Sequence, residues 1–179
     1  MSGLALLISG GGTYLADRRA RASGRLAQRA LDDGREASTR ALWSDAIEAV
    51  HRVLIDPTAE PIGDRLQTLR IRLTFLVDGL PDWTALDRWL AAEHHLGVTL
   101  GREVMEKARP GASIDEQLSL LRLHQDWGMA FAQNLRHARN IGYSPDDLDE
   151  LRAHAWAVIK GVYRRNGWEE PPAEPARAT

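Results

Sequence analysis

Residues 62–80 of the chain read IGDRLQTLRIRLTFLVDGL, and this stretch decides the fold class. Its large apolar residues recur at alternating intervals of four and three positions: Ile62, Leu66, Leu69, Leu73, Leu76 and Leu80. A helix with this spacing places all six side chains on one face, as in a helix that packs along its length against other helices. The stretch therefore predicts an amphipathic helix within a bundle, and its apolar face is also suited to self-association.

Proline and glycine divide the neighbouring sequence into segments of helical length. Residues 31–56 predict one helix, because their apolar positions fall on a single face. Those positions are Leu42, Ala46, Val50 and Val53. A short connector, 57–61, separates this helix from the 62–80 stretch. On the other side, Asp82 is the expected N-cap of a helix that runs to Ala108.

Two further helices begin with recognisable capping residues. Ser113 and Glu116 have the spacing of a capping box, ahead of a helix that runs to Asn140. Residues 144–147 supply a cap residue, a proline at the first helical position and acids in the first turn. No segment alternates apolar and polar residues over a useful length. We therefore predict an all-α protein, an antiparallel bundle of four to five helices with an extended N-terminal helix.

Length and composition bound the possible classes of protein. The 179 residues suit one domain with extensions, and we place the bundle at 36–167 and a disordered, proline-containing tail at 168–179. The net charge of −2 provides no overall basic field for binding nucleic acid, so nucleic acid is not an expected partner. The absence of cysteine excludes disulfides, thiolate metal sites and cysteine nucleophiles.

The N-terminal segment is the feature that indicates a location. Residues 1–16 carry no charge, and the following segment, 17–35, is rich in arginine. An apolar segment with positive charge on one side is typical of a helix that leaves a membrane on its cytoplasmic face. We therefore expect a membrane anchor at 1–16, a basic helical stalk at 17–35 and a location at the cytoplasmic face of the inner membrane. The expected lipid-facing residues are Leu4, Leu6, Leu7, Ile8, Arg18, Arg19 and Arg21.

Other interpretations of this segment stay open. Sixteen helical residues span about 24 Å, less than the roughly 30 Å hydrocarbon core of a bilayer. The segment could therefore span a thinned bilayer, lie in the interface or be the remnant of a longer anchor. Its apolar run followed by Gly10–Gly12 also resembles the strand and glycine turn of a nucleotide-binding fold. The third interpretation is a plain N-terminus of a cytoplasmic bundle, with the arginines solvated.

Two polar residues lie on faces that are otherwise apolar. Glu93 falls in a stripe with Leu86 and Leu90, and His124 falls in a stripe with Trp127. Glu93 and His124 could meet across two packed helices and hold a metal ion, with His94 or His95 nearby. A buried Glu–His or Glu–Arg pair that fixes helix register is the favoured interpretation. Because neither Glu93 nor His124 belongs to a Glu-x-x-His motif of the kind that bundle metal sites use, we expect no metal and no cofactor.

Arg88 and His94 form a second candidate pair, separated by five residues. This spacing resembles the Arg-x4-6-His pattern of HEPN-type ribonucleases, which are all-α proteins that use the arginine and the histidine in RNA cleavage. The resemblance implies a catalytic role for Arg88 and His94. Trp89, however, stands where that family usually has a polar residue after the arginine.

The layout also resembles a diffuse group of uncharacterised actinobacterial proteins. The resemblance rests on residues 4–16, the arginines of 18–29 and the segment 89–97, WLAAEHHLG. It implies a bacterial, anchored helical protein and no activity. We therefore expect a non-enzymatic interaction or scaffold module that binds a protein partner or itself, with a small-molecule ligand undetermined. The alternative is a soluble all-α enzyme, either a HEPN-like ribonuclease or a metal-dependent enzyme.

Overall fold

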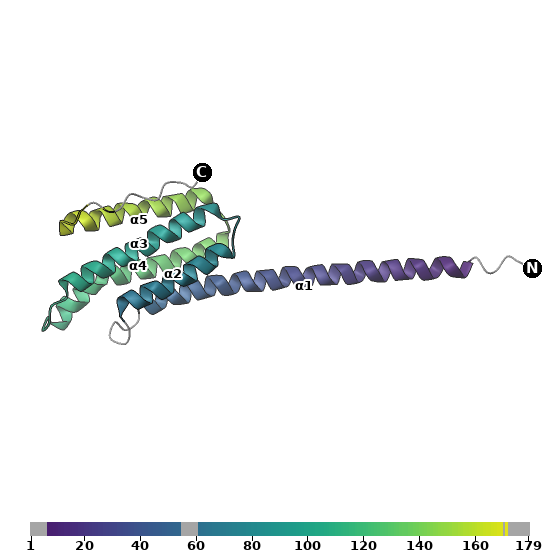
Figure 1. The fold of residues 1–179 in the computed structure, drawn as a ribbon, viewed down its shortest axis with the longest axis horizontal. Coiled ribbons are helices and arrows are strands. Elements are labelled where there is room, and N and C mark those ends of the chain that lie inside the picture. The colour runs from purple at the N-terminus through teal and green to yellow at the C-terminus, as the bar shows by residue number, and fades with distance from the viewer. Residues whose placement is uncertain (1–6, 55–60, 170, 172–179) are drawn as a thin grey trace, which may run out of the picture. The chain divides into compact units, whose positions relative to one another are not determined.

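The computed structural model describes the backbone of residues 7–54, 61–169 and 171, and the side chains of residues 28–54, 61–169 and 171. Every regular element in this part of the chain is an α-helix, so the predicted all-α class is confirmed (Figure 1). The helices are α1 (Leu7–Leu54), α2 (Ile62–Asp78), α3 (Thr84–Lys107), α4 (Ile114–Ile141) and α5 (Pro145–Asn166).

The chain divides into two compact units, Met1–Arg40 and Ala41–Thr179. In the first unit, Gln28 donates a hydrogen bond to Asp32, and Arg40 forms an ion pair with Glu36. Both contacts join side chains four residues apart along the helix, the spacing at which neighbours meet on a helix surface. The second unit contains the bundle, and its first residue lies beyond the boundary expected at residue 36.

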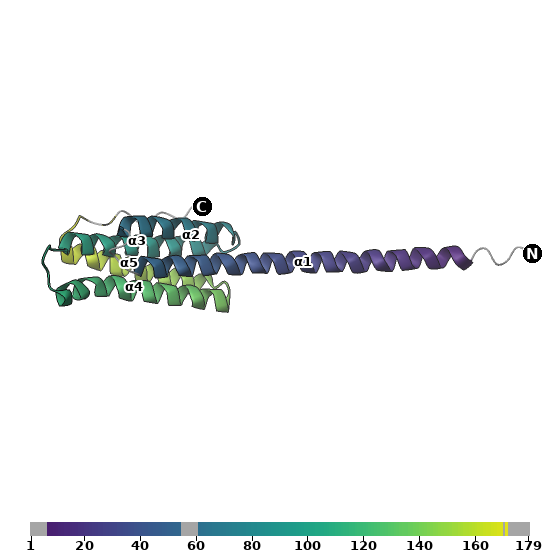
Figure 2. The same ribbon diagram turned by 90° about the horizontal axis from the view of Figure 1, so that it is seen from below.

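Within the second unit, helices that follow one another in the chain run antiparallel (Figure 2). The third helix, α3, packs against α2, α4 and α5 and so occupies the centre of the bundle. Arg88 near its start pairs with Asp149 near the start of α5, and Glu103 near its end pairs with Arg165 near the end of α5. These pairs show that α3 and α5 run parallel, as alternate helices of an up-and-down bundle do.

The predicted stripe on α2 forms part of the core. Leu66, Leu69, Leu73 and Leu76 are buried, while Ile62 and Leu80 are partly buried against the same cluster. The predicted face of α1 is buried as well, at Ala46, Val50 and Val53. In the first half of α3 the indole of Trp89 is fully buried and meets the ring of Phe131 edge-on, with centroids 5.8 Å apart.

The helix ends agree with the sequence at α4 and differ at α3. Ser113 and Glu116 form the predicted capping box at the start of α4. Asp82 is not the N-cap of α3, because the cap position is occupied by Trp83 and the helix begins at Thr84. The Trp83 ring packs against Trp43 of α1 and against Tyr143, with centroids 5.6 Å and 5.3 Å away. Aromatic packing, which local sequence does not reveal, therefore fixes this helix start.

At the C-terminal end, Trp168 belongs to the folded domain, although we expected it to begin the tail. Its indole N–H donates to Glu106, its ring packs edge-on against Tyr163, and the Arg102 guanidinium lies 4.0 Å from the ring centroid. Gly167 allows this return of the chain, because it adopts the left-handed conformation, with φ of 65°. Residues 170 and 172–179 of the expected tail lie outside the described residues.

The expected anchor falls largely outside what the structure describes. Leu4 and Leu6 are not described, and neither are the side chains of Leu7, Ile8, Arg18, Arg19 and Arg21. Among the described residues, no helix has the length and apolar character needed to cross a membrane. The interpretation of this segment as a strand and glycine turn is wrong from Leu7 onward, because those residues belong to α1.

Candidate functional site

Glu93 lies in the core between α3 and α4, with 5% of its surface exposed. Its two carboxylate oxygens accept hydrogen bonds from two indole N–H groups. Trp89, four residues earlier on α3, donates to Oε1 over 3.1 Å, and Trp127 of α4 donates to Oε2 over 3.0 Å. The side chain therefore joins the two helices through tryptophan, and not through the histidine or arginine partner that we expected.

The environment of Glu93 favours its neutral form. Burial raises the pKa of the carboxyl group to about 7, because desolvation outweighs the two indole hydrogen bonds that stabilise the charge. A carboxyl group with this pKa changes charge near neutral pH, whereas a solvated glutamate is fully ionised there.

His124 is buried beside the same tryptophan. Its ring centroid lies 5.3 Å from that of Trp127, and its Nε2 has no hydrogen-bond partner among the described residues. Burial, with a smaller contribution from the positive charge of Arg65, lowers the pKa of His124 to about 4. In the described part of the chain no hydrogen bond or ion pair joins His124 to Glu93. Nor do the described residues contain a group of three acidic or histidine side chains that could hold a metal ion.

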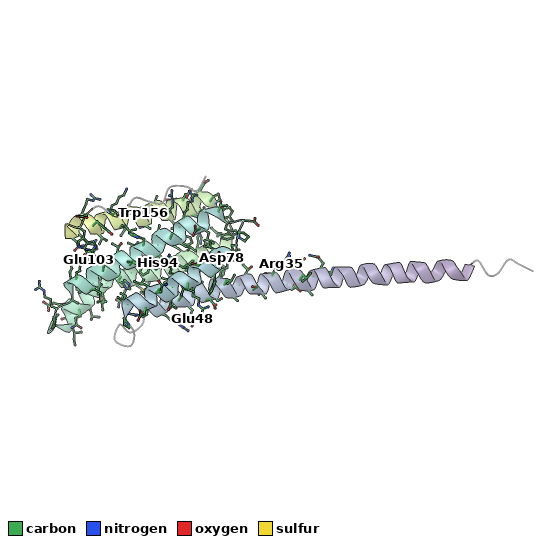
Figure 3. All side chains as sticks on the ribbon, in the orientation of Figure 1. Arg35, Glu48, Asp78, His94, Glu103 and Trp156 are labelled. Carbon is green, nitrogen blue, oxygen red and sulfur yellow. The ribbon has the colours of Figure 1, made fainter. Side chains whose placement is uncertain are left out.

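The second candidate pair lies on the surface, in a groove of about 630 Å³ lined by α2, α3 and α5. Figure 3 labels a residue of the groove from each of these helices: Asp78, His94 and Trp156. Leu73, Leu90 and Trp156 contribute apolar surface. Arg70, Asp78 and Asp87 are exposed and carry charges of both signs. The groove thus combines apolar contact area with charged groups, as binding sites commonly do.

Two adjacent histidines of α3 line this groove. His94 Nε2 lies 3.1 Å from the carbonyl oxygen of Leu66, and because a carbonyl can only accept, this nitrogen carries the proton. His95 stacks on the indole of Trp156 with centroids 5.3 Å apart. Burial lowers the pKa of both histidines, and for His94 the charge of Arg70 contributes further. Both imidazoles are therefore neutral at neutral pH.

Arg88 of α3 lines the part of the groove that lies next to α5. Its guanidinium lies 3.3 Å from Asp149, and Arg152 approaches the same carboxylate at 3.3 Å. All three side chains are mostly buried, with exposed fractions of 26%, 31% and 22%. Arg88 and His94 therefore line one groove, as a catalytic pair would require, but each is also engaged in a contact that holds neighbouring helices together.

A further polar cluster, which sequence reasoning missed, joins the other ends of α3 and α5. The buried carboxylate of Glu103, labelled in Figure 3, accepts hydrogen bonds from both ends of the Arg165 guanidinium, from Lys107 and from Asn166. These donors, Arg165 foremost, lower the pKa of Glu103 to about 2. The carboxylate is thus ionised throughout the physiological range and fixes the register of the two helices.

The sequence offered a local signal for one contact of the core site: the i, i+4 spacing of Trp89 and Glu93 could have indicated their hydrogen bond. Most of the groove, in contrast, could not be predicted from the sequence. No local signal places Arg70 and Asp78 of α2 in one groove with Trp156 of α5, because the groove depends on how three helices pack.

Comparison with family models, with curated proteins and with solved structures found no match to this chain. The fold and the groove therefore define its class: a helical-bundle protein with a surface groove of mixed charge.

Proposed function

We propose that this protein is a non-enzymatic helical interaction module at the cytoplasmic face of the inner membrane. In this proposal the bundle binds a protein partner in the groove between α2, α3 and α5, and the N-terminal segment associates with the membrane. The groove is the observation that carries the proposal, because it offers apolar contact area beside exposed charges. Interfaces typically have this composition, an apolar centre with a polar rim.

The charges of the groove specify the kind of partner. Arg70 and Asp78 lie on α2 about two turns apart, which is roughly 12 Å along the helix axis. Asp87 of α3 adds a second carboxylate. A helical segment with an acidic side chain at one end and a basic side chain about two turns away would complement this arrangement.

The contacts of the polar residues favour binding over catalysis. Glu93 is held by two indoles in the core, His94 is bonded to the Leu66 carbonyl, and Arg88 is paired with Asp149. Each contact stabilises helix packing, so each of these side chains has a structural role that requires no substrate. This use of the residues supports an interaction module.

A charge exchange within the groove tests partner binding. Combining Arg70→Asp with Asp78→Arg preserves the net charge but inverts the pattern along α2. The matched control combines Arg122→Asp with Asp126→Arg, an exposed pair on α4 outside the groove. The immobilised full chain and both variants would be compared by quantitative capture from a cell extract. We expect that some proteins of the extract bind to the wild type and to the control variant but not to the groove variant. Equal retention by all three chains would contradict the proposal.

Vesicle flotation tests the membrane part of the proposal separately. The full chain is expected to float with phosphatidylcholine vesicles that contain phosphatidylglycerol, and less with neutral ones, because arginines attract anionic headgroups. Changing Arg18, Arg19 and Arg21 to glutamine should weaken this binding, as should deletion of residues 1–16. If the full chain does not bind vesicles at low salt, the membrane part of the proposal is wrong. The proposal of partner binding is not affected by that result.

A HEPN-like ribonuclease is the second candidate, and one observation favours it: Arg88 and His94 line the same groove. Single-stranded RNA incubated with the purified full chain separates the two candidates. Cleavage that is lost in both Arg88→Ala and His94→Ala would establish the ribonuclease. Intact RNA, with both variants folded, would support the interaction module.

A further inference from the structure

The seam between α3 and α4 contains an acid with no basic partner. Four ionisable side chains are buried in the described part of the chain: Arg65, Glu93, Glu103 and His124. Glu103 is surrounded by cations, and Arg65 donates to the Val53 carbonyl over 2.9 Å. Glu93, in contrast, has two neutral indole donors and no ion pair among the described residues. Its charge is therefore compensated by hydrogen bonds alone.

The neighbouring helices add little charge to this seam. His124 of α4 is neutral above about pH 4, because burial lowers its pKa to that value. His51 of α1 lies at a partly exposed position, where it is bonded to Arg136 of α4 and not to Glu93. Arg65 of α2 acts on His124 through its charge. Ionisation of Glu93 therefore places a weakly compensated negative charge in the core, which is unfavourable.

We propose that Glu93 makes the docking of α4 on α3 depend on pH: α4 is held firmly while the carboxyl group is neutral and loosens when it ionises. The geometry supports this coupling because Trp127, which donates to Glu93, is also the side chain of α4 that packs against Gly97 of α3. Loosening of α4 uncovers Trp127 and Phe131, both buried in the closed bundle.

The size of the effect follows from proton linkage. Opening of the seam returns the Glu93 pKa from about 7 to its ordinary value of 4.5, so the open state releases a proton more readily. Ionisation of Glu93 should therefore raise the equilibrium constant for opening about tenfold between about pH 6 and about pH 8. His124 acts in the opposite direction over this interval, because the open state binds a proton more readily at low pH. Its contribution is common to the wild type and to a Glu93 variant.

Hydrogen exchange of the full chain tests the proposal. Opening constants of the α4 amides around Trp127 would be measured at several pH values, after correction for the intrinsic exchange rate, in the wild type and in Glu93→Gln. We expect the opening constant of the wild type, divided by that of Glu93→Gln, to rise about tenfold between about pH 6 and about pH 8. Glu150→Gln, the same change at an exposed position, should behave as the wild type. A ratio that stays constant with pH would overturn the proposal.

A second variant keeps the test decisive if Glu93→Gln does not fold. Trp127→Phe removes one donor to the carboxylate without changing any titrating group, and this donor lowers the Glu93 pKa. The midpoint of the opening transition should therefore move to higher pH. A midpoint that does not move would show that ionisation of Glu93 is not the cause.

Discussion

Trp127 of α4 lies directly against Gly97 of α3: a Cβ atom on residue 97 would stand 2.3 Å from Cη2 of the indole. Glycine at this position lets the two helices approach closely enough for the Trp127 N–H to reach Glu93, one turn away on α3. The close approach and the hydrogen bond are thus two parts of one interlock between the helices.

Gly97→Ala should destabilise the protein by about 2 kcal/mol, because the added methyl group would force the rigid indole to move within a packed core. Urea unfolding followed by circular dichroism measures this loss. Gly161→Ala is the control, since a Cβ at that position of α5 meets nothing within 4 Å. There we expect stabilisation by about 0.5–1 kcal/mol from helix propensity. Equal effects of the two substitutions would argue against the interlock.

Glu93→Gln should stabilise the protein at high pH. The folded-state pKa is raised to about 7 from an ordinary value of 4.5, so the folded state favours the protonated form. The penalty for ionisation is absent below about pH 4.5, grows as pH rises and is complete above about pH 7, where it amounts to about 3 kcal/mol. Chemical unfolding at several pH values should therefore show the variant more stable at about pH 8 and similar to the wild type near pH 4.5. A constant difference at all pH values would contradict this explanation.

His124→Phe should reduce the sensitivity to acid. The folded-state pKa of His124 is lowered to about 4, whereas an unfolded imidazole titrates near 6.5. As pH falls, the unfolded chain binds a proton first, so stability is lost progressively from about pH 6.5 to about pH 4. Thermal unfolding should show a smaller decrease in Tm over this interval for the variant. His154→Phe, at an exposed position of α5, should retain the decrease seen in the wild type.

Glu103→Ala should weaken the contact between α3 and α5 by about 3 kcal/mol, because it removes the buried acceptor of Arg165, Lys107 and Asn166. The pKa of Glu103 is lowered to about 2, so its contribution is present above about pH 4.5 and is lost as pH falls through about 2. Unfolding at neutral pH measures the loss. Lys107→Ala, at a side chain that is 48% exposed, should cost less than about 1 kcal/mol. Similar losses in both variants would contradict a special contribution from the buried acceptor.

Ser113→Ala should cost about 1 kcal/mol, because the Ser113 hydroxyl accepts from the Glu116 N–H in the capping box of α4. Ser144→Ala provides a contrast from the same residue type at the corresponding position of α5. The Ser144 side chain makes no capping hydrogen bond, so its removal should change stability by a few tenths of a kcal/mol at most. Chemical unfolding of both variants shows whether the capping hydrogen bond of Ser113 contributes stability that Ser144, which lacks such a bond, does not.

Local sequence predicted the features that depend on neighbours along the chain. The spacing of Leu66, Leu69 and Leu73 indicated the buried face of α2, and Ser113 with Glu116 indicated the start of α4. The prediction of Asp82 as the N-cap of α3 was wrong, because the start of that helix depends on Trp43 and Tyr143 from distant segments.

The sequence predicted which residues belong to the candidate sites but not how those residues are arranged. Glu93 and His124 were identified as polar residues on apolar faces, and both are buried. The partner on the facing helix was not predictable, because Trp127 reaches Glu93 from α4. Likewise Arg88 and His94 were identified from their spacing, while the groove that they share requires α2 and α5 in place.

The sequence by itself determined an all-α bundle, because the period of apolar residues along each segment fixes which face of a helix must be buried. Only the tertiary structure decided the environment of the polar groups. A carboxylate on an apolar face becomes an ion pair, a metal ligand or a proton-sensitive group according to what the facing helix brings to it. For Glu93 that helix brings an indole, and for Glu103 the facing helix brings an arginine. This difference separates one pKa of about 7 from another of about 2 on the same helix.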